Sequence, residues 1–280
     1  MQQRDLKKVT EHLEVAVVVL NYNGLPLLQQ LLPNWKAETA IFPGAALIIA
    51  DNASTDGSIA YLAEYYPEIP LITFEKNHGY AEGFHRATLE LDAEYYVLLS
   101  SDVEVGKNWL EPLIHFMDSD PEIGACQAKV MSWHRKNQFE YAGAAGGFMD
   151  VLGFPFCRGR IFSHLENDDA QYEDTKELFW AGGCAITVRA AAYHEAGGFD
   201  PDFFAHMEEI DLCWRMKRLG YKIMYCPKST VYHMGGATLD YNNPFKLYLN
   251  CQNNLAMLVK NLHPAEPVSY THLRAHETSN

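Results

Sequence analysis

Tyr95-Tyr96-Val97-Leu98-Leu99-Ser100-Ser101-Asp102-Val103-Glu104 is the stretch of sequence that decides the fold class. The apolar run over residues 95–99 is typical of a strand buried on both faces, and such strands occur in parallel sheets covered by helices. Because ligands of open α/β sheets bind outside the carboxyl ends of the strands, Asp102 lies where a metal ion or a ribose would be held. Ser-Ser-Asp is also an ordinary turn sequence, so this stretch alone leaves both interpretations open.

Three more strand and helix pairs precede this strand. Apolar runs predict the strands at 15–20, 46–50 and 71–74, and a helical pattern follows each of them. This alternation predicts an α/β fold with a mostly parallel central sheet flanked by helices. Asn21, Asp51 and Asp102 stand at or just after the ends of three strands. Polar side chains therefore converge on one edge of the sheet, where we expect a binding cleft.

The loop after the third strand is rich in glycine. Gly79 and Gly83 would let the backbone approach a phosphate group. The loop lacks the Lys-Ser or Lys-Thr pair of a P-loop, and the chain contains no G-x-G-x-x-G sequence. A nucleoside triphosphatase and a dinucleotide-dependent dehydrogenase are therefore disfavoured.

The composition restricts the partners and the compartment. The 280 residues carry a formal net charge of −14, which argues against nucleic acid because phosphate backbones are bound through clustered Lys and Arg. The six cysteines are scattered, without a C-x-x-C pair, as in a reduced cytosolic protein. The N-terminus lacks the apolar core of a signal peptide, and no run of about 18 apolar residues occurs. We therefore expect a globular, cytoplasmic protein.

The second half of the chain contains two groups of candidate site residues. Glu208, Glu209 and Asp211 crowd the first turn of a predicted helix. Each acid is favoured there by the helix dipole, by about 0.3–1 kcal/mol, but three acids also repel one another, and this raises the pKa of a carboxyl toward that of a general base. His233 follows a predicted strand and is either a packed side chain or a metal ligand.

The chain is predicted to form one domain with additions at both ends. We divide it into an N-terminal extension (1–14), a first half with the polar sheet edge (15–104), a second half (105–240), a C-terminal helix (241–264) and a tail (265–280). The tail loses apolar periodicity, so we expect it to be disordered. An acidic run at 166–169 is expected to be a solvated loop, with a lid over a substrate as the alternative.

Seven short motifs together resemble family 2 glycosyltransferases of the GT-A fold, and within them the branch that includes rhamnosyltransferases of bacterial polysaccharide assembly. They stand at 18–24, 51–58, 77–83, 98–103, 197–200, 208–215 and 233–236. Their order and spacing carry the resemblance, which covers residues from about 15 to 263. It implies a Rossmann-like central sheet and a C-terminal portion on the side of the acceptor.

The resemblance implies a donor site along the sheet edge. Asp51 matches the acid that binds the base of a nucleotide sugar, and Asn21 and Asn23 border the nucleotide. Ser100 and Asp102 occupy the ends of the family's DxD-type motif. Further donor contacts are implied for Asn77, Gly79, Trp180 and Gly182.

The resemblance also implies a metal ion and a general base. Asp102 and His233 match the ligands of Mg²⁺ or Mn²⁺. Glu209 matches the base, with Glu208 and Asp211 as the alternatives. Three places depart from the family pattern: Ser100 replaces an Asp or Asn, Glu209 is one methylene longer than the usual Asp, and Phe84-His85 stands where small amides are common.

These roles together imply an inverting, metal-dependent sugar transfer in cell-surface polysaccharide synthesis. The implied donor is a dTDP- or UDP-sugar, rhamnose being the sugar of the branch, and the acceptor is a hydroxyl group of a glycan or a lipid-linked molecule. A lipid-linked acceptor implies peripheral contact with the inner face of the membrane. Two other classes remain open: a sugar nucleotidyltransferase, although residues 21–24 lack its basic Gly-rich loop, and a catalytically impaired glycan-binding or scaffold protein.

Overall fold

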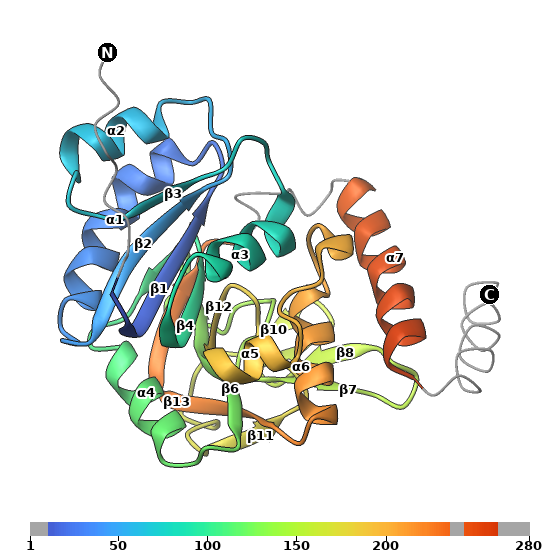
Figure 1. Cartoon of the computed structure of the whole chain (residues 1–280). Coiled ribbons are helices and arrows are strands. Elements are labelled where there is room, and N and C mark those ends of the chain that lie inside the picture. Colours follow the sequence, from blue (N-terminus) through green and yellow to red (C-terminus); the bar gives the residue numbers. More distant parts are fainter. Residues whose placement is uncertain (1–10, 236–243, 263–280) are drawn as a thin grey trace.

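A computed structural model describes residues 11–235 and 244–262 of the chain and shows one nine-stranded sheet between two layers of helices (Figure 1). The strands of this sheet, in chain order, are β1 (Leu13–Asn21), β2 (Ala45–Asp51), β3 (Leu71–Thr73), β4 (Ala93–Ser100), β5 (Val103–Val105), β6 (Ile123–Ser132), β11 (Lys176–Leu178), β12 (Ala185–Arg189) and β13 (Lys222–His233). The helices are α1 (Leu25–Thr39), α2 (Ser58–Tyr65), α3 (Gly79–Leu89), α4 (Leu110–Asp118), α5 (Ala190–Glu195), α6 (Glu208–Arg218) and α7 (Pro244–Asn261). The predicted α/β architecture, a central sheet flanked by helices, is confirmed.

The first half of the chain forms a parallel sheet in the order β4-β1-β2-β3. Asn21 of β1 pairs with Asp51 of β2, and Leu20 pairs with Ser100 of β4. Because parallel strands in register end at the same edge, the polar residues predicted at the strand ends are neighbours here.

The second half of the chain adds strands in both directions. β12 lies between β4 and β6 and is antiparallel to both, whereas β13 is parallel to β6 and antiparallel to β5 and β11. The pairing with β5 sets His233 opposite Val103. Apart from β5, the strands of the two predicted halves therefore form two blocks of a single sheet, which meet where β4 pairs with β12.

The alternation of side chains along β1 explains the two helical layers. Val15, Val17 and Val19 pack in one apolar core with residues of α1, α2 and α4. Ala16, Val18 and Leu20 face the other core, with residues of α3, α5 and α6. Both faces are buried, as the unbroken apolar run predicted.

The structure differs from local sequence patterns in three places. The sequence over 180–188 predicts one glycine-kinked strand, but β12 starts only at Ala185, since Gly183 and Cys184 form a turn. Short apolar runs at 222–225 and 230–232 predict two strands, but they form one strand, β13, with an irregularity between Cys226 and Thr230. Region 143–177, whose sequence has no clear period, contains the hairpins β7 (Gly147–Met149) with β8 (Pro155–Cys157) and β9 (Arg160–Ile161) with β10 (His164–Leu165).

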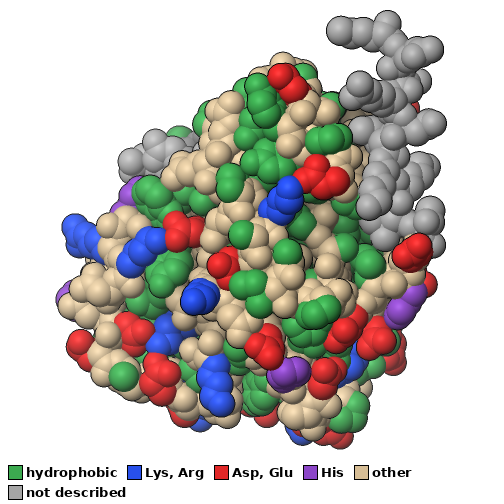
Figure 2. Space-filling model, turned by 90° about the vertical axis from the view of Figure 1, so that its left-hand side faces the viewer, with side chains coloured by type: hydrophobic (Ala, Val, Ile, Leu, Met, Phe, Trp, Pro, Cys, Tyr) green, Lys and Arg blue, Asp and Glu red, His purple; other side chains and the backbone are tan. Residues whose placement is uncertain are grey.

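The ends and the surface of the chain add little to the site. The predicted tail and most of the predicted N-terminal extension lie outside the described residues. Within the described ranges, none of the helices has the length and apolar character needed to span a bilayer. On the face at the left-hand side of Figure 1, basic side chains are interspersed with acidic ones, so neither sign dominates that surface (Figure 2).

The short strand β5 is held in place by α1. Nε1 of Trp35 donates a hydrogen bond to the carbonyl oxygen of Val103 at 2.6 Å. The side chain of Asn34 bonds both backbone groups of Val105, at 2.9 and 3.0 Å. These contacts fix the strand that precedes the turn to α4 and follows Asp102.

Replacing Trp35 with Phe tests this anchor. The variant keeps most of the apolar contact but leaves the buried carbonyl of Val103 without its donor, which is expected to lower the free energy of unfolding by about 1–3 kcal/mol. Urea unfolding measures the change. Trp133→Phe is the control, because the indole of Trp133 bonds Glu104 at the surface and its loss should cost less. Equal stability of Trp35→Phe and the wild type would show that the hydrogen bond from Trp35 does not hold β5 in place.

Candidate functional site

Asn21 and Asp51 form a buried hydrogen-bonded pair at the ends of β1 and β2. Nδ2 of Asn21 donates to Oδ2 of Asp51 at 2.8 Å and to Oγ of Ser54 at 3.1 Å. The backbone N–H of Ser54 donates to the other oxygen of Asp51 at 2.8 Å. A carboxylate accepts about four hydrogen bonds, so Asp51 keeps capacity for a ligand.

Asn23 joins the first two loops of the sheet edge. Its side-chain oxygen accepts a hydrogen bond from the backbone of Thr55 at 2.7 Å, and its own backbone N–H donates to Oγ of Ser54 at 2.9 Å. Asp56 accepts hydrogen bonds from the backbone N–H groups of Leu25 and Ser58. It thereby binds the first residue of both α1 and α2.

Asn52 organises the third loop and was missed by the sequence analysis. Its amide donates to Oδ1 of Asn77 at 3.0 Å and to the carbonyl of Gly79 at 2.8 Å, and its oxygen accepts from the backbone of His78 at 2.9 Å. Asn77 in turn accepts from the backbone N–H of Gly79 at 2.8 Å. Asn52 directly follows Asp51 in the sequence, and this position at a strand end is the signal that could have revealed Asn52 as a site residue.

Asp102 and His233 are brought together by the pairing of β5 with β13. Oδ2 of Asp102 lies 3.4 Å from Nε2 of His233, and Nδ1 of His233 lies 3.4 Å from Oε1 of Glu140. The carboxylates of Asp102 and Glu140 are buried, and the imidazole of His233 is 14% exposed. Glu140 was not predicted, because it lies in a region without secondary-structure periodicity. A cavity of about 310 Å³ opens beside this trio, lined by Ser132, Glu140, Tyr141, Leu165, His233 and Met234.

The charges of this group of side chains support one another. Burial by itself would lower the pKa of His233, but the neighbouring Cys184 and the carboxylates of Asp102 and Glu140 raise it well above its ordinary value. Burial would raise the pKa of Asp102, but the hydrogen bonds from His233 and Ser100 and the charge of His233 hold it below its ordinary value. The site is therefore built to stabilise a positive charge beside Asp102.

Asp102 and His233 also suit a divalent cation. Oδ1 of Asp102 is buried and has no hydrogen-bond partner among the described residues. The 3.4 Å between Oδ2 and Nε2 is close to the spacing of about 3.0 Å between neighbouring ligands of an octahedral cation bound at about 2.1 Å. In the part of the chain that the structure describes, no three Asp, Glu, His or Cys side chains gather as a complete metal site. The remaining ligands would have to come from a bound molecule and water.

Glu208 and Glu209 begin α6 and have different protonation properties. Burial, and then the charge of Glu209, raise the pKa of Glu208 well above its ordinary value. Burial raises the pKa of Glu209 to about 7, while backbone N–H groups, that of Gly183 among them, oppose the shift. Glu209 is therefore the carboxyl that exchanges a proton near neutral pH.

Tyr80 connects these acids with the sheet edge. Its hydroxyl donates to the carbonyl of Gly183 at 2.7 Å. Burial raises its pKa well above the ordinary value, and the charges of Glu208, Cys184, Glu209 and Asp102 add to that rise. The charges of Glu208, Glu209 and Asp102 thus all act on one phenol.

Three predicted site residues, Trp180, Gly182 and Asp211, make hydrogen bonds to other parts of the protein that hold the local structure together. Trp180 is buried and donates from Nε1 to the carbonyl of Phe148 at 2.8 Å, and the N–H of Gly182 donates to the buried side chain of Gln127 at 2.7 Å. Asp211 is buried and accepts from Arg215 at 2.8 Å, from Lys260 at 2.9 Å and from Asn261 at 2.7 Å. These contacts fix the 180–183 segment and attach α7 to α6.

The acidic run at 166–169 is tied to the body of the domain. Nζ of Lys129, a buried side chain of β6, lies 2.7 Å from Asp168 and also pairs with Glu173. Burial would lower the pKa of Lys129, but these two carboxylates raise it. The run is therefore anchored by a buried cation next to the loop that supplies Leu165 to the cavity.

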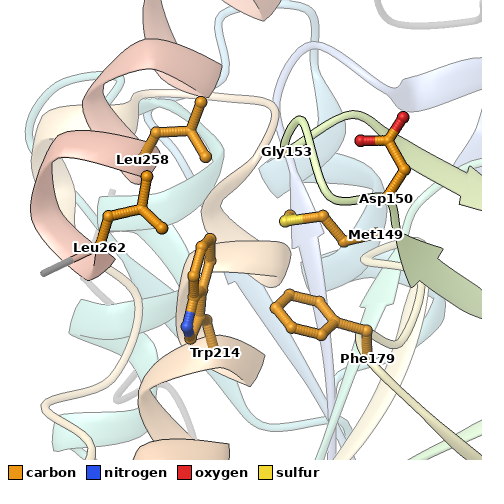
Figure 3. A pocket seen from close by; sticks show the side chains of 7 residues that line it. All are labelled: Met149, Asp150, Gly153, Phe179, Trp214, Leu258 and Leu262. Carbon is orange, nitrogen blue, oxygen red and sulfur yellow. The ribbon is translucent and has the colours of Figure 1, made fainter. Parts of the chain in front are cut away.

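A second cavity, of about 140 Å³, lies away from these groups between α6, α7 and the β7–β8 hairpin (Figure 3). It is lined by Met149, Asp150, Gly153, Phe179, Trp214, Leu258 and Leu262. The ring of Phe179 meets that of Trp214 edge to face at 5.2 Å. The carboxylate of Asp150 accepts hydrogen bonds from its own turn, so this cavity offers apolar contact and no candidate catalytic group.

The comparison with protein families decides the identity. A model of glycosyl transferase family 2 matches residues 16–192. The chain belongs to glycosyl transferase family 2. It is therefore a glycosyltransferase, as the motifs implied. This glycosyltransferase is 34% identical over 232 residues to rhamnosyltransferase WbbL of Escherichia coli (strain K12), an alignment that covers 78% of this chain and 83% of WbbL.

A second relative places the glycosyltransferase in the same branch. It is 25% identical over 234 residues to the N-acetylglucosaminyl-diphospho-decaprenol L-rhamnosyltransferase of Mycobacterium tuberculosis, with 78% of this chain and 75% of that protein covered. The resemblance to the rhamnosyltransferase-like branch is thereby confirmed.

Solved structures confirm the GT-A fold. GalNAc-T7 with UDP, GalNAc and Mn²⁺ superposes with a TM-score of 0.66 at 15% identity, over 88% of this chain and 47% of the other. The mannosyltransferase PcManGT from Pyrobaculum calidifontis with GDP-Man and Mn²⁺ gives a TM-score of 0.61 at 15% identity, over 93% and 69%. The chain thus spans about half the length of GalNAc-T7. At such identities the likeness shows the fold alone.

Replacing Gly79 with Ala tests the third loop of the site. Gly79 has φ +76°, and a Cβ atom there would lie 2.5 Å from the ring of Phe204 and 2.8 Å from its carbonyl oxygen. We expect a loss of about 1–3 kcal/mol in unfolding free energy, together with weaker nucleotide binding in calorimetry. Gly220→Ala is the control, since Gly220 has φ +95° with no atom within 4 Å of the added Cβ. A Gly79→Ala variant no less stable than Gly220→Ala would contradict the packing argument.

Proposed function

We propose that this glycosyltransferase moves a sugar, with inversion and with the help of a divalent cation, from a nucleoside diphosphate sugar to a hydroxyl group of a glycan or lipid-linked acceptor. The observation that carries the proposal is the apposition of Asp102 and His233, 3.4 Å apart, in the same site as a carboxyl group whose pKa is about 7. Its relatives act as rhamnosyltransferases, one of them on N-acetylglucosaminyl-diphospho-decaprenol, which supports rhamnose and a lipid-linked acceptor in cell-surface polysaccharide synthesis.

The donor lies along the carboxyl edge of β1, β2 and β4 in this proposal. Asp51, held by Asn21, would accept a hydrogen bond from the pyrimidine of a dTDP- or UDP-sugar. The loop around Asn77 and Gly79, together with Asn23, would border the rest of the nucleotide. The hydrogen bonds that these residues already make within the protein hold the cleft in shape before the donor arrives.

Asp102 and His233 would hold the cation, Mg²⁺ or Mn²⁺. Once bound, the cation would offset the negative charge that develops on the departing diphosphate. The side chain of Ser100 helps to lower the pKa of Asp102, which supports a role in keeping this carboxylate ionised. Glu140 faces the far nitrogen of the imidazole ring, where a carboxylate orients a metal-binding His.

Glu209 is the proposed general base. A base must be deprotonated to act, which argues against Glu208, whose pKa is raised well above the ordinary value. Asp211 is engaged with Arg215, Lys260 and Asn261. Glu209 would take the proton of the acceptor hydroxyl while the oxygen of that hydroxyl attacks the anomeric carbon from the face opposite the diphosphate. A single displacement of this kind inverts the anomeric centre.

The proposed location is the cytoplasmic side of the membrane, with peripheral contact. A lipid-linked acceptor presents its sugar at a bilayer surface. The outer face of α7 supports such contact, because it exposes apolar side chains. They are Phe245, Leu247, Tyr248, Leu255 and Val259.

Glu209→Gln tests the base. Removing a positioned base is expected to lower turnover about 10²- to 10⁴-fold while donor affinity stays within a factor of a few. Transfer is measured with a panel of dTDP- and UDP-sugars and Mn²⁺, and donor affinity by calorimetry. Glu208→Gln is the matched control: the raised pKa of Glu208 favours its neutral form, so its amide replacement should keep most of the turnover. Near wild-type turnover of Glu209→Gln would move the base to a neighbouring acid.

The pH dependence gives a second reading of the same residue. With a pKa of about 7, Glu209 should make turnover rise as the pH increases through 7, and Glu209→Gln should lack this rising limb.

The free energy of unfolding should change with pH in the opposite direction to turnover. Because the folded pKa lies above the ordinary value of 4.5, the contribution of Glu209 to stability is fully present below pH 4.5 and is lost as the pH rises through 7.

Asp102→Ala tests the cation site. The variant is expected to lose both the stimulation by Mn²⁺ and at least about 10-fold in donor affinity, because one of two protein ligands is gone. Calorimetric titration of the donor with and without Mn²⁺ measures both effects. Glu104→Ala is the control, since Glu104 lies two residues away but bonds Trp133 and Lys136. Unchanged donor affinity in Asp102→Ala would count against the proposed site.

A further inference from the structure

The segment that leads into α6 has an unusual backbone. Phe204, His206 and Met207 all have positive φ, at +53°, +72° and +71°. Residues other than Gly rarely adopt such backbone angles, and these angles persist only where the surrounding structure enforces them. The segment continues directly into Glu208 and Glu209. The position of the proposed base therefore depends on whatever holds these residues.

Asn253 of α7 is the side chain that holds this segment. Its Nδ2 lies 2.8, 2.9 and 2.8 Å from the carbonyl oxygens of Phe203, Ala205 and His206. The side chain is buried, with 2% of its surface exposed. An amide has two N–H groups, so three acceptors share two donors. Carbonyl oxygens that converge in this way repel one another and usually surround a cation, and here the amide takes that place.

The same segment also reaches the loop of the proposed donor site. The carbonyl oxygen of Phe204 accepts from the backbone N–H groups of Tyr80 and Ala81, at 2.7 and 3.1 Å. These are N–H groups of the first turn of α3, which starts at Gly79. Phe204 thus closes the N-terminus of the helix that follows the glycine-rich loop. One short segment connects the donor edge of the sheet with the acids of α6.

α7 is attached to the domain independently of Asn253. Lys260 bonds Asp200 at 2.6 Å and Asp211 at 2.9 Å, and Asn261 bonds Asp211 at 2.7 Å. At the other side, Nδ2 of Asn254 donates to the carbonyl of Gly153 at 3.2 Å. Asn253 is therefore presented from a helix that stays docked when this one side chain is changed.

We infer that Asn253 is a positioning residue of the glycosyltransferase, which locks residues 203–207 so that Glu209 and the start of α3 keep a fixed relation during sugar transfer. Asn253 does not touch the reacting atoms and acts through the backbone of the segment. The inference rests on the proposed role of Glu209. It assigns a catalytic task to α7, a helix that lies outside the family match at residues 16–192.

The test uses Asn253→Ala and Asn253→Asp in the full chain, with Asn250→Ala as the matched control. Asn250 lies on the same helix, and among the described residues its side-chain amide donates within that helix, to the carbonyl of Lys246 at 2.9 Å. Turnover should fall about 10- to 100-fold in Asn253→Ala, the scale expected for a misplacement near 1 Å, and further in Asn253→Asp, whose carboxylate oxygens face three carbonyl oxygens. Asn250→Ala should retain wild-type turnover.

Two readouts separate positioning from a general loss of structure. Hydrogen exchange at residues 204–209 should accelerate at least about 10-fold in Asn253→Ala, while the amides of β1 and β4 exchange as in the wild type. The rising limb of the pH–rate profile should move below its wild-type position near 7, because a displaced Glu209 is better hydrated.

Three outcomes would count against the inference. They are wild-type turnover of Asn253→Ala, unchanged exchange at 204–209, and acceleration spread equally over the sheet. Failure of the proposed function is distinguishable: the wild type would then transfer no sugar from any nucleotide donor, while the exchange experiment would still report whether Asn253 holds the segment.

Discussion

The antiparallel pairing of β5 with the last residues of β13 is the constraint on which the site depends. It sets His233 opposite Val103 and thereby places an imidazole next to the carboxylate of Asp102, far away in the sequence. β5 has three residues and is fixed from its other side by Trp35 and Asn34 of α1. A helix of the first half of the chain and a strand of the second half thus cooperate to bring two side chains together.

The electrostatics around this pairing divide the acids of the site into two kinds. The imidazole of His233 helps to keep Asp102 ionised, and Cys184, Asp102 and Glu140 raise the pKa of that imidazole. At the start of α6 no imidazole offsets the effect of burial in this way, and the pKa values of Glu208 and Glu209 are raised. A permanently charged carboxylate suits the binding of a cation, and a carboxyl that titrates near 7 suits proton transfer. Burial alone shifts both groups upward, so the nearby imidazole makes the difference.

The helix α7 has more than a peripheral part in this architecture. Lys260 and Asn261 complete the shell around Asp211, and Asn253 gathers the carbonyl groups of the segment before α6. The acids of α6 are therefore fixed by a later helix, whose Lys260 and Asn261 follow Asp211 in the chain by 49 and 50 residues. Asp211, one of the three acids crowded at the start of α6, belongs to this attachment, which explains how three carboxylates coexist in one helical turn.

Local sequence determined the architecture, because the strands buried on both faces and the polar residues at their ends follow from apolar runs and turn chemistry. The motifs from Asn21 to His233 likewise indicated the family, since they record which groups stand at the sheet edge. Tertiary structure decided what the pattern could not encode. Glu140 meets His233 through a loop without periodicity, Asn253 meets residues 203–206 from another helix, and β12 enters the sheet antiparallel. Each depends on long-range packing, which local periodicity does not register.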